Sequence, residues 1–342
     1  MLRTVQVSNS NSRDSRTVES SFFATLSVSP TWRHRSLRRT YSSAPVCFVV
    51  SAFGRSIFEE IAVEYETISV APVTRSLGAV ISGIDLTQPL SGQQFEDISK
   101  AIREHLVVFF RDQDLTDEQH LAFASNFGIP NVYPTTRARG LDRPMEFIED
   151  GPNSSPKADL WHTDVAILET PPDFGVLSMR HAPDAGGDTM WLNLYQVYEN
   201  LSEPMKRLVL ELEQYVHPGE LMEQITIEKF GQEVWDKVAS DFSGVYHPLV
   251  RKHPETGRPA LFMCGSNVRN LVGMTPRESD TILDLLRRGL EEPSLQLRWR
   301  WSNNDIALWD ERCTNHRALS DHTGLVRKVR RCTVGAGRPA PM

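Results

Sequence analysis

The chain has 342 residues, a hydrophobic share of 40% and a net charge of -7. This hydrophobic share is enough for a sizeable core and excludes a mostly disordered protein. The acidic balance argues against a nucleic-acid-binding protein, although it leaves room for a local basic pocket that binds an anion. We therefore do not expect nucleic acid as a partner. Because no apolar run approaches the ~20 residues that span a bilayer, we do not expect a membrane as a partner either.

The first 62 residues differ in composition from the rest of the chain. They are rich in Ser and Arg, and Asp14 and Glu19 are the only acidic residues up to Ser56. This composition is typical of an organellar transit peptide. A disordered tail, or upstream sequence translated from a misplaced start, is the competing explanation. We therefore expect residues 1–62 to be a disordered or non-native extension, with organellar import as the alternative to a cytoplasmic location.

The four cysteines, Cys47, Cys264, Cys313 and Cys332, contain no C-x-x-C pair. Neither a zinc ribbon nor a redox pair is therefore indicated. Reduced, buried thiols are typical of cytosolic proteins, and this favours a cytoplasmic location.

The globular pattern begins near residue 63, with alternating strand and helix signals. Residues 68–73 predict a strand, and Ser91 predicts the N-cap of a helix with apolar residues at helical spacing. The apolar run at residues 106–113 suits a buried strand. A second helix is expected to begin after Thr116 and to stop at Gly128.

The remainder of the chain is dominated by short β-like runs between Gly and Pro turns. These runs cover residues 174–193, 247–265, 305–319 and 325–337, with helical inserts near 205–216 and 278–292. Such a pattern predicts a mainly β protein with helical decoration, folded as a single β-sandwich or jelly roll. We expect the domain to span residues 63–337 and residues 338–342 to form a tail.

The stretch "ADLWHTDVAILETPP" places His162 and Asp164 two residues apart. On a strand, this spacing puts both side chains on one side. Two His and one carboxylate form the ligand set of non-haem Fe(II) oxygenases, which leaves coordination positions open. The spacing also arises by chance, as His253–Glu255 shows, so an ordinary strand edge remains an alternative.

A third ligand must come from a distant part of the chain, and His316 follows an apolar run that predicts a strand. Arg327 and Arg331 come shortly after it. Residues four apart on a strand point the same way, so the two guanidinium groups could face one pocket and bind an anion. Solvated surface charges are the alternative interpretation.

Several motifs along the chain occur together in one known family. They read "LGAVISGIDLTQPLS", "LVVFFRDQDLT", "WHTDVAILETPP", "GGDTMWLN", "HPLVRKHPETGRPALF" and "LWDERCTNHRALSD". In this order they resemble the taurine / 2,4-dichlorophenoxyacetate dioxygenase family of Fe(II)- and 2-oxoglutarate-dependent enzymes. The resemblance covers Tyr65 to Gly337.

The resemblance implies a double-stranded β-helix, or jelly-roll, core and a set of roles. It implies that His162, Asp164 and His316 bind iron. Thr189 and Arg327 would bind the distal carboxylate of 2-oxoglutarate. Arg331 would contact the anionic group of the substrate or the near end of the co-substrate, and Tyr133 would contact the substrate. Iron, 2-oxoglutarate and O2 would together hydroxylate an aliphatic carbon of a small anionic substrate, with succinate and CO2 as co-products. The carboxylate of Asp164 excludes the halogenating branch, which lacks it.

Two departures from the family pattern concern the substrate. Taurine-specific members carry a His shortly before the Tyr at position 133, where this chain has Asn131. They also carry an Asn four residues before the first iron ligand, where this chain has Ala158. Both argue against taurine and leave another sulfonate, a sulfate ester, or an aryloxy or organic acid.

Two alternatives to the oxygenase hypothesis remain at this stage. The first is a jelly-roll protein that binds an organic anion without catalysis. The second is a metal-dependent hydrolase that uses the same His and Asp ligands, with zinc as the metal. The family often self-associates, so a homo-oligomer is a possible assembly.

Overall fold

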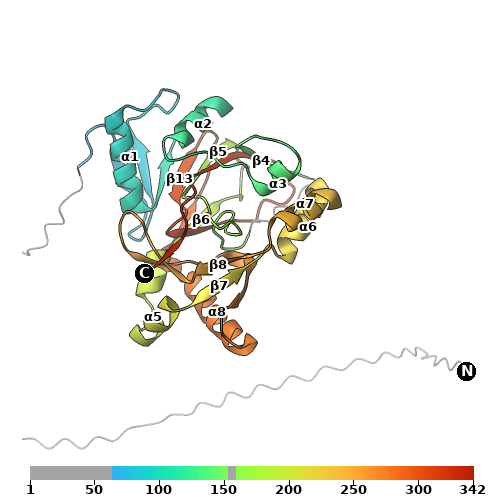
Figure 1. The fold of residues 1–342 in the computed structure, drawn as a ribbon. Coiled ribbons are helices and arrows are strands. Elements are labelled where there is room, and N and C mark those ends of the chain that lie inside the picture. The colour runs from blue at the N-terminus through green and yellow to red at the C-terminus, as the bar shows by residue number, and fades with distance from the viewer. Residues whose placement is uncertain (1–63, 153–158) are drawn as a thin grey trace, which may run out of the picture. The chain divides into compact units, whose positions relative to one another are not determined.

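The computed structural model of the chain describes residues 64–152 and 159–342, which belong to one compact unit (Figure 1). Residues 1–62, expected to be an extension, and Ala158 lie outside the described residues. None of the described helices combines the length and the apolar character that crossing a membrane requires.

The domain is built mainly of β-strands, as predicted. The large sheet has the order β1 (Ser69–Pro72), β2 (Ala79–Ser82), β3 (Val107–Phe110), β13 (Ile306–Asp310), β5 (Phe174–His181), β15 (Arg327–Val334) and β4 (Glu146–Asp150). A second sheet has the order β12 (Gln296–Trp299), β6 (Thr189–Asn193) and β14 (Thr314–Ala318). A third sheet has the order β11 (Val268–Leu271), β7 (Glu213–Val216) and β8 (Val245–Pro248). A fourth sheet has the order β10 (Pro259–Leu261), β9 (Val250–Lys252) and β16 (Ala340–Pro341).

Eight α-helices decorate the described part of the chain. They are α1 (Gly92–His105), α2 (Asp117–Ser125), α3 (Pro134–Ala138), α4 (Leu194–Glu199), α5 (Glu203–Leu210), α6 (Glu220–Phe230), α7 (Gln232–Asp241) and α8 (Pro276–Leu290). Figure 1 shows α6 and α7 beside α3, away from α1 and α2. Residues 340–341 of the expected tail form β16, which pairs with β9.

The N-termini of the first two helices are set by local hydrogen bonds. The Ser91 hydroxyl accepts from the Gln94 N–H at 3.1 Å, and the Gln94 side chain accepts from the Ser91 N–H at 2.9 Å. Thr116 and Gln119 form the same reciprocal pair at the start of α2. These capping boxes satisfy N–H groups that the first helical turn leaves unpaired, which confirms both predicted starts.

The prediction that α2 stops at Gly128 is wrong, because the helix ends at Ser125. Gly128 has a φ of 153° and lies against the backbone of Gly335, where a Cβ would stand 2.7 Å from the Gly335 nitrogen. The glycine is therefore required by a close backbone contact with the end of β15.

The predicted helix at residues 205–216 is also only partly correct. Helix α5 ends at Leu210, and residues 213–216 form β7 between β8 and β11. Pairing on both sides supplies the backbone hydrogen bonds of this segment, so the tertiary context overrides its helical periodicity. Helices α3, α4, α6 and α7 were not predicted at all.

Strand β3 of the large sheet is buried on both faces. Val107 and Phe109 of β3 pack into the interior between the sheets, whereas Val108 and Phe110 pack against α1 and α2. Side chains alternate between the two faces of a strand, so a continuous apolar run marks a strand covered on both sides. This confirms a buried strand within residues 106–113, although the strand ends at Phe110 and residues 111–112 are exposed.

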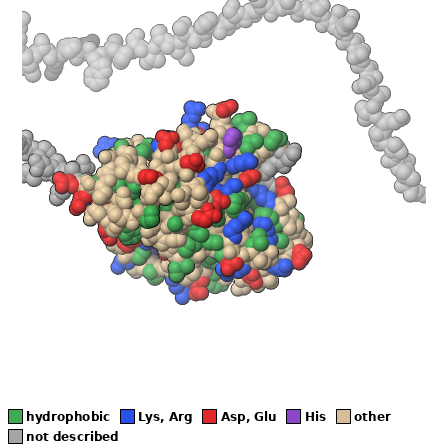
Figure 2. Space-filling view, turned by 90° about the horizontal axis from the view of Figure 1, so that it is seen from above, with side chains coloured by type: hydrophobic (Ala, Val, Ile, Leu, Met, Phe, Trp, Pro, Cys, Tyr) green, Lys and Arg blue, Asp and Glu red, His purple; other side chains and the backbone are tan. Residues whose placement is uncertain are grey.

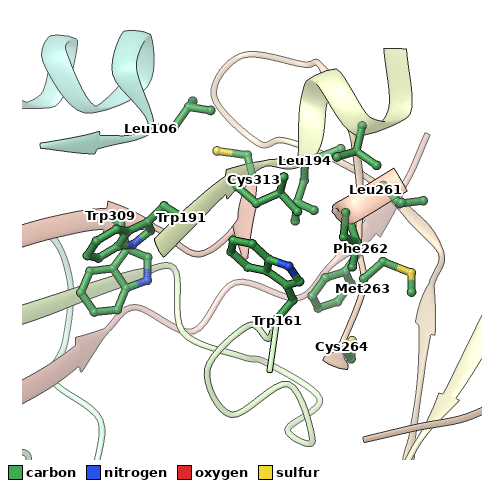
Figure 3. Packing of buried hydrophobic residues seen from close by; sticks show 14 of the residues in the cluster. Leu106, Trp161, Trp191, Leu194, Leu261, Phe262, Met263, Cys264, Trp309 and Cys313 are labelled. Atoms are coloured by element: carbon green, nitrogen blue, oxygen red, sulfur yellow. The ribbon is translucent and has the colours of Figure 1, made fainter. Parts of the chain in front are cut away.

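The interior core contains several tryptophans (Figure 3). The ring centroids of Trp191 and Trp309 lie 5.8 Å apart. Trp309 also lies 5.0 Å from the ring of His316, so part of the core directly supports the candidate site. On the outside of the domain, Figure 2 shows basic and acidic side chains lying close together.

Candidate metal centre and co-substrate pocket

The two predicted histidine ligands are joined by an isolated β-bridge. The His162 N–H donates to the His316 carbonyl at 3.0 Å, and the His316 N–H donates to the His162 carbonyl at 2.9 Å. His316 lies on β14, whereas His162 lies in an irregular segment rather than on a strand. Side chains of directly opposed residues emerge on the same side, and the two imidazole centroids lie 4.3 Å apart.

Asp164 completes the cluster. Its Oδ1 lies 3.8 Å from Nε2 of His162 and 4.0 Å from Nε2 of His316. One ligand atom from each of the three side chains falls within 4.8 Å of the others. The structure therefore brings together the three predicted metal ligands, and their role as ligands stays a prediction.

The donor set fits a divalent metal ion. Nδ1 of His162 lies 2.7 Å from the Leu160 carbonyl, which leaves Nε2 free to face Asp164. Among the described residues, the buried Oδ2 of Asp164 has no hydrogen-bond partner. Burial lowers the pKa of His316 well below its usual value, so its imidazole is neutral and can bind a metal.

Arg327 lies deep in the same pocket, 3% exposed. Its Nε donates to the Gly187 carbonyl at 3.0 Å, and its Nη2 donates to the Thr189 hydroxyl at 3.4 Å. No carboxylate of the described residues lies within ion-pair distance of it. Burial lowers the pKa of the guanidinium, and the carboxylates of Asp150 and Asp188 only partly oppose this effect. A buried cation without a directly paired anion is unfavourable, so this arrangement favours an anionic ligand.

Thr189 is placed next to Arg327 by β6, and its hydroxyl has a second donor. Trp301 Nε1 donates to the Thr189 Oγ1 at 3.0 Å. A hydroxyl has two acceptor positions and one proton. Because Trp301 and Arg327 fill both acceptor positions, the Thr189 O–H is left to donate, which suits a carboxylate ligand.

Arg331 lies beside the metal ligands. Its Nη1 donates to Asp164 Oδ1 at 2.7 Å, and its Nη2 donates to Glu146 at 3.3 Å. Its buried Nε has no hydrogen-bond partner among the described residues. Tyr133, the predicted substrate contact, lies with its ring centroid 5.3 Å from the guanidinium carbon. Burial raises the pKa of Tyr133 to about 12, so its hydroxyl stays protonated.

All seven predicted site residues line one cavity of ≈ 690 Å³. Part of its wall is apolar and consists of Leu160, Val165, Leu221, Met222, Ile225 and Phe230. Four of these residues belong to α6. Asn131 does not line this cavity; its side-chain amide donates to the Gly335 carbonyl at 2.7 Å.

Sequence reasoning missed three residues that contact the predicted set. Glu146 contacts Arg331, Trp301 contacts Thr189, and Glu311 accepts from the backbone N–H of Asp164 at 3.1 Å. Each contact joins residues more than a hundred positions apart. No spacing in the sequence could have indicated them.

Comparison with known proteins decides the family. A family profile described as taurine catabolism dioxygenase TauD, TfdA family matches residues 69–333. The chain belongs to the TauD/TfdA family. The jelly-roll core and the resemblance inferred from the motifs are thereby confirmed.

Individual relatives of this TauD/TfdA-family chain are named for sulfur-containing substrates. It is 33% identical over 274 residues to an alkylsulfatase of Acinetobacter baylyi, a match covering 79% of this chain and 85% of that one. It is 34% identical over 281 residues to an alpha-ketoglutarate-dependent sulfate ester dioxygenase of Pseudomonas putida, covering 80% and 91%. The crystal structure of a taurine dioxygenase from Burkholderia xenovorans matches with a TM-score of 0.67 and 33% identity, covering 80% and 93%.

These relatives decide between the three hypotheses about activity. The TauD/TfdA-family chain is a 2-oxoglutarate-dependent dioxygenase, as predicted. The non-catalytic binding protein and the hydrolase were the wrong alternatives.

Proposed function

We propose that this dioxygenase holds Fe(II) with His162, Asp164 and His316 and hydroxylates an aliphatic carbon of a small anionic substrate, a sulfate ester foremost. The observation that carries the proposal is the shared cavity. The ligand triad, the Arg327 guanidinium and the Arg331 Nε all face it, and among the described residues Arg327 has no ion-pair partner and Arg331 Nε has no hydrogen-bond partner. One chamber therefore offers a metal site and two separate positions for anions.

Two imidazoles and one carboxylate suit ferrous iron, which prefers nitrogen and oxygen ligands to a soft thiolate. When bound, iron together with 2-oxoglutarate and O2 supplies the oxidation that converts C–H into C–OH, with succinate and CO2 as co-products. The protein's part is to orient the reactants. Nδ1 of His162 is held by the Leu160 carbonyl, so its Nε2 stays directed at the metal position.

Arg327 and Thr189 are suited to the distal carboxylate of 2-oxoglutarate. Arg327 supplies a buried positive charge, and Thr189 supplies the O–H that Trp301 and Arg327 leave free to donate. Hydrogen bonds between charged partners are about twice as strong as neutral ones. The pair therefore fixes one end of the co-substrate while its other end faces the triad.

Arg331 is suited to the anionic group of the substrate. Its Nε is buried and unpaired among the described residues, and Tyr133 borders the same space. The apolar wall around α6 favours a hydrocarbon portion over the charged amine of taurine. Asn131, which replaces the family's His, is turned away from the cavity and offers that amine no contact.

Hydroxylation of a sulfate ester would also break the bond between the carbon and the sulfate group. Replacing one hydrogen on the carbon that bears the sulfate gives a carbon with both a hydroxyl and a sulfate group. Loss of the hydroxyl proton and departure of sulfate then leave an aldehyde. The oxidised carbon and the released sulfate should therefore appear in equal amounts.

The test is a substrate panel with the purified chain, Fe(II), 2-oxoglutarate and O2. We expect alkyl sulfates to stimulate succinate release more than alkanesulfonates or aryloxy acids, with one sulfate released per aldehyde. Taurine should stay near the rate without substrate. A panel in which neutral alcohols stimulate as strongly as alkyl sulfates would contradict the proposal.

The matched controls are two Asp→Asn variants. Asp164→Asn removes a metal-ligand charge and should abolish turnover. Asp159→Asn changes an acid that accepts from the Ser320 N–H at 3.2 Å and does not line the cavity. It should retain turnover, and equal loss in both variants would indicate a general folding defect instead.

We also propose a cytoplasmic location. Cys264, Cys313 and Cys332 are buried and unpaired, which supports a reducing compartment. Fractionation of cells that produce the full chain, with organellar and cytosolic markers, tests this location against import through residues 1–62.

A further inference from the structure

Glu311 lies directly beneath the metal ligands and is fully buried. It follows β13 in the turn that leads to β14. Its Oε2 accepts from the Asp164 N–H at 3.1 Å, and its Oε1 accepts from Trp309 Nε1 at 2.7 Å. The same Oε1 lies 3.9 Å from Nδ1 of His316. One carboxylate thus touches the backbone of one metal ligand and faces the ring of another.

His316 needs an acceptor at this position. Its Nε2 faces Asp164 at 4.0 Å, so binding a metal through Nε2 leaves the proton on Nδ1. That Nδ1 is buried and has no hydrogen-bond partner among the described residues. The Glu311 oxygen at 3.9 Å is about 1 Å beyond an ordinary N–H···O distance, a gap that a small side-chain adjustment can close.

The two histidines are therefore held in different ways. Nδ1 of His162 lies 2.7 Å from a backbone carbonyl, that of Leu160. Nδ1 of His316 instead faces a carboxylate, that of Glu311, at 3.9 Å. Metal-binding histidines commonly donate their other ring N–H to a carboxylate, which fixes the tautomer and makes the ligand a better donor.

The backbone around Glu311 is also held firmly. Arg251 is buried, donates from Nε to the Arg312 carbonyl at 2.6 Å, and donates from Nη2 to the Glu311 carbonyl. Burying a carboxylate without a cation at its oxygens is unfavourable. Burial and the neighbouring Asp164 carboxylate raise the pKa of Glu311 well above its usual value. The N–H groups of Asp164 and Trp309 donate to its two oxygens, so the side chain serves groups that belong to the metal site or support it.

We propose that Glu311 is a positioning residue for the metal centre, which accepts the Nδ1 proton of His316 and the backbone N–H of Asp164. It sets the tautomer of one ligand and the backbone position of the other. The inference rests on the proposed metal site, and it adds a residue that neither binds the metal nor lines the cavity.

The test is metal affinity, measured without turnover. Mn(II) binding to the full chain is followed by calorimetry for wild type and for Glu311→Gln. The amide keeps the size of the side chain but offers only one acceptor to three N–H donors. We expect the dissociation constant for Mn(II) to rise about 10–100-fold, the range for loss of a group that orients a metal ligand.

Glu255→Gln is the matched control. Glu255 pairs with Arg312 at 2.7 Å in the same region, but it does not contact a metal ligand. It should bind Mn(II) as wild type does. A change in Glu311→Gln no larger than that in Glu255→Gln would overturn the proposal.

A second measurement needs no substitution. In the Zn(II)-loaded wild type, histidine ¹⁵N spectra should show His316 bound through Nε2, with a protonated Nδ1 protected from exchange with solvent. Coordination through Nδ1, or rapid loss of that proton, would overturn the proposal even if Glu311→Gln failed to fold. A wild type that binds neither metal would instead contradict the proposed function itself, and this inference with it.

Discussion

Arg331 and Asp164 form a buried ion pair beside the candidate metal centre, with 2.7 Å between Nη1 and Oδ1. The same Oδ1 is the Asp164 atom that lies 3.8 Å and 4.0 Å from Nε2 of His162 and His316. The guanidinium therefore shares one carboxylate oxygen with the metal position. The position of the metal ligand and the capacity to bind an anionic substrate are coupled through this contact.

The first prediction concerns Arg331→Lys. Lysine keeps the charge but cannot contact two acceptors with a planar fork. Loss of a hydrogen bond to a charged group costs about 1.5–3 kcal/mol of binding free energy. We therefore expect the KM for an alkyl sulfate to rise about 10–100-fold. Steady-state kinetics across charged and neutral substrates measures this effect.

Arg330→Lys is the control for this prediction. Arg330 directly precedes Arg331 on β15 and pairs with Glu149 at 3.1 Å. Its substitution should leave the KM unchanged. Equal losses across charged and neutral substrates in Arg331→Lys would count against a role in anion binding.

The second prediction concerns Glu146→Gln. Glu146 lies opposite Arg331 in the β4–β15 pairing and accepts from its Nη2 at 3.3 Å. Removing one of the two carboxylates that neutralise Arg331 should strengthen binding of an anionic substrate. For a partly exposed pair the effect is about 1 kcal/mol, so the KM for an alkyl sulfate should fall about fivefold.

Two comparisons make the Glu146 result decisive. The gain should shrink in high salt, because salt screens charges near the surface. Glu199→Gln, which removes a surface pair with Arg258 at 2.8 Å, should have no effect on KM. An unchanged or higher KM in Glu146→Gln would show that Glu146 does not compete with the substrate anion for Arg331.

The third prediction concerns Trp301→Phe. The substitution removes the N–H that donates to Thr189 Oγ1 at 3.0 Å, and it leaves Thr189 and Arg327 in place. The Thr189 hydroxyl is then free to turn away from the co-substrate. A neutral hydrogen bond contributes about 1 kcal/mol, so the KM for 2-oxoglutarate should rise about fivefold, while the affinity for Mn(II) stays the same. A rise in both constants would point to a wider disturbance of the core.

The fourth prediction concerns acid stability. His120 is fully buried, and its Nε2 lies 3.3 Å from the Val176 carbonyl. Burial, with a smaller contribution from Arg180, lowers its pKa from 6.5 to about 4. Between these values the unfolded chain binds a proton that the folded chain does not, so the free energy of unfolding falls as the pH falls from 6.5 to 4. The loss amounts to at most about 3 kcal/mol.

His120→Gln isolates this contribution, because glutamine can donate to the Val176 carbonyl but does not titrate. Urea unfolding at several pH values should show a shallower pH dependence in the variant between pH 6.5 and 4. Parallel curves for the two proteins would mean that His120 is already protonated in the folded state.

The local elements were largely predictable, and the reasons are local. Ser91 and Thr116 each start a helix through a partner three residues away, and the run around Val107–Phe110 is apolar at every position because both faces of β3 are buried. The end of α2 and the strand β7 were mispredicted. Gly128 is needed for a contact with Gly335, and residues 213–216 pair with strands on either side.

The candidate site was likewise predictable from the sequence only in part. The residue types and motif order pointed to His162, Asp164 and His316, because a ferrous ion requires that chemistry. Their meeting depends on a β-bridge between residues 154 positions apart, since residue 162 pairs with residue 316. Glu311 belongs to a motif that was noted, but its carboxylate acquires a role only where the turn after β13 reaches Asp164.

The sequence by itself determined the class of chemistry, the family and most of the elements, because caps, side-chain alternation and ligand types act over a few residues. Only the tertiary structure decided which charges face one another. It paired Arg331 with Asp164 and Glu146, left Arg327 without an ion-pair partner among the described residues, and placed Glu311 3.9 Å from the ring of His316. An ion pair needs its charged atoms within about 4 Å of each other, so such pairings depend on how distant strands come together.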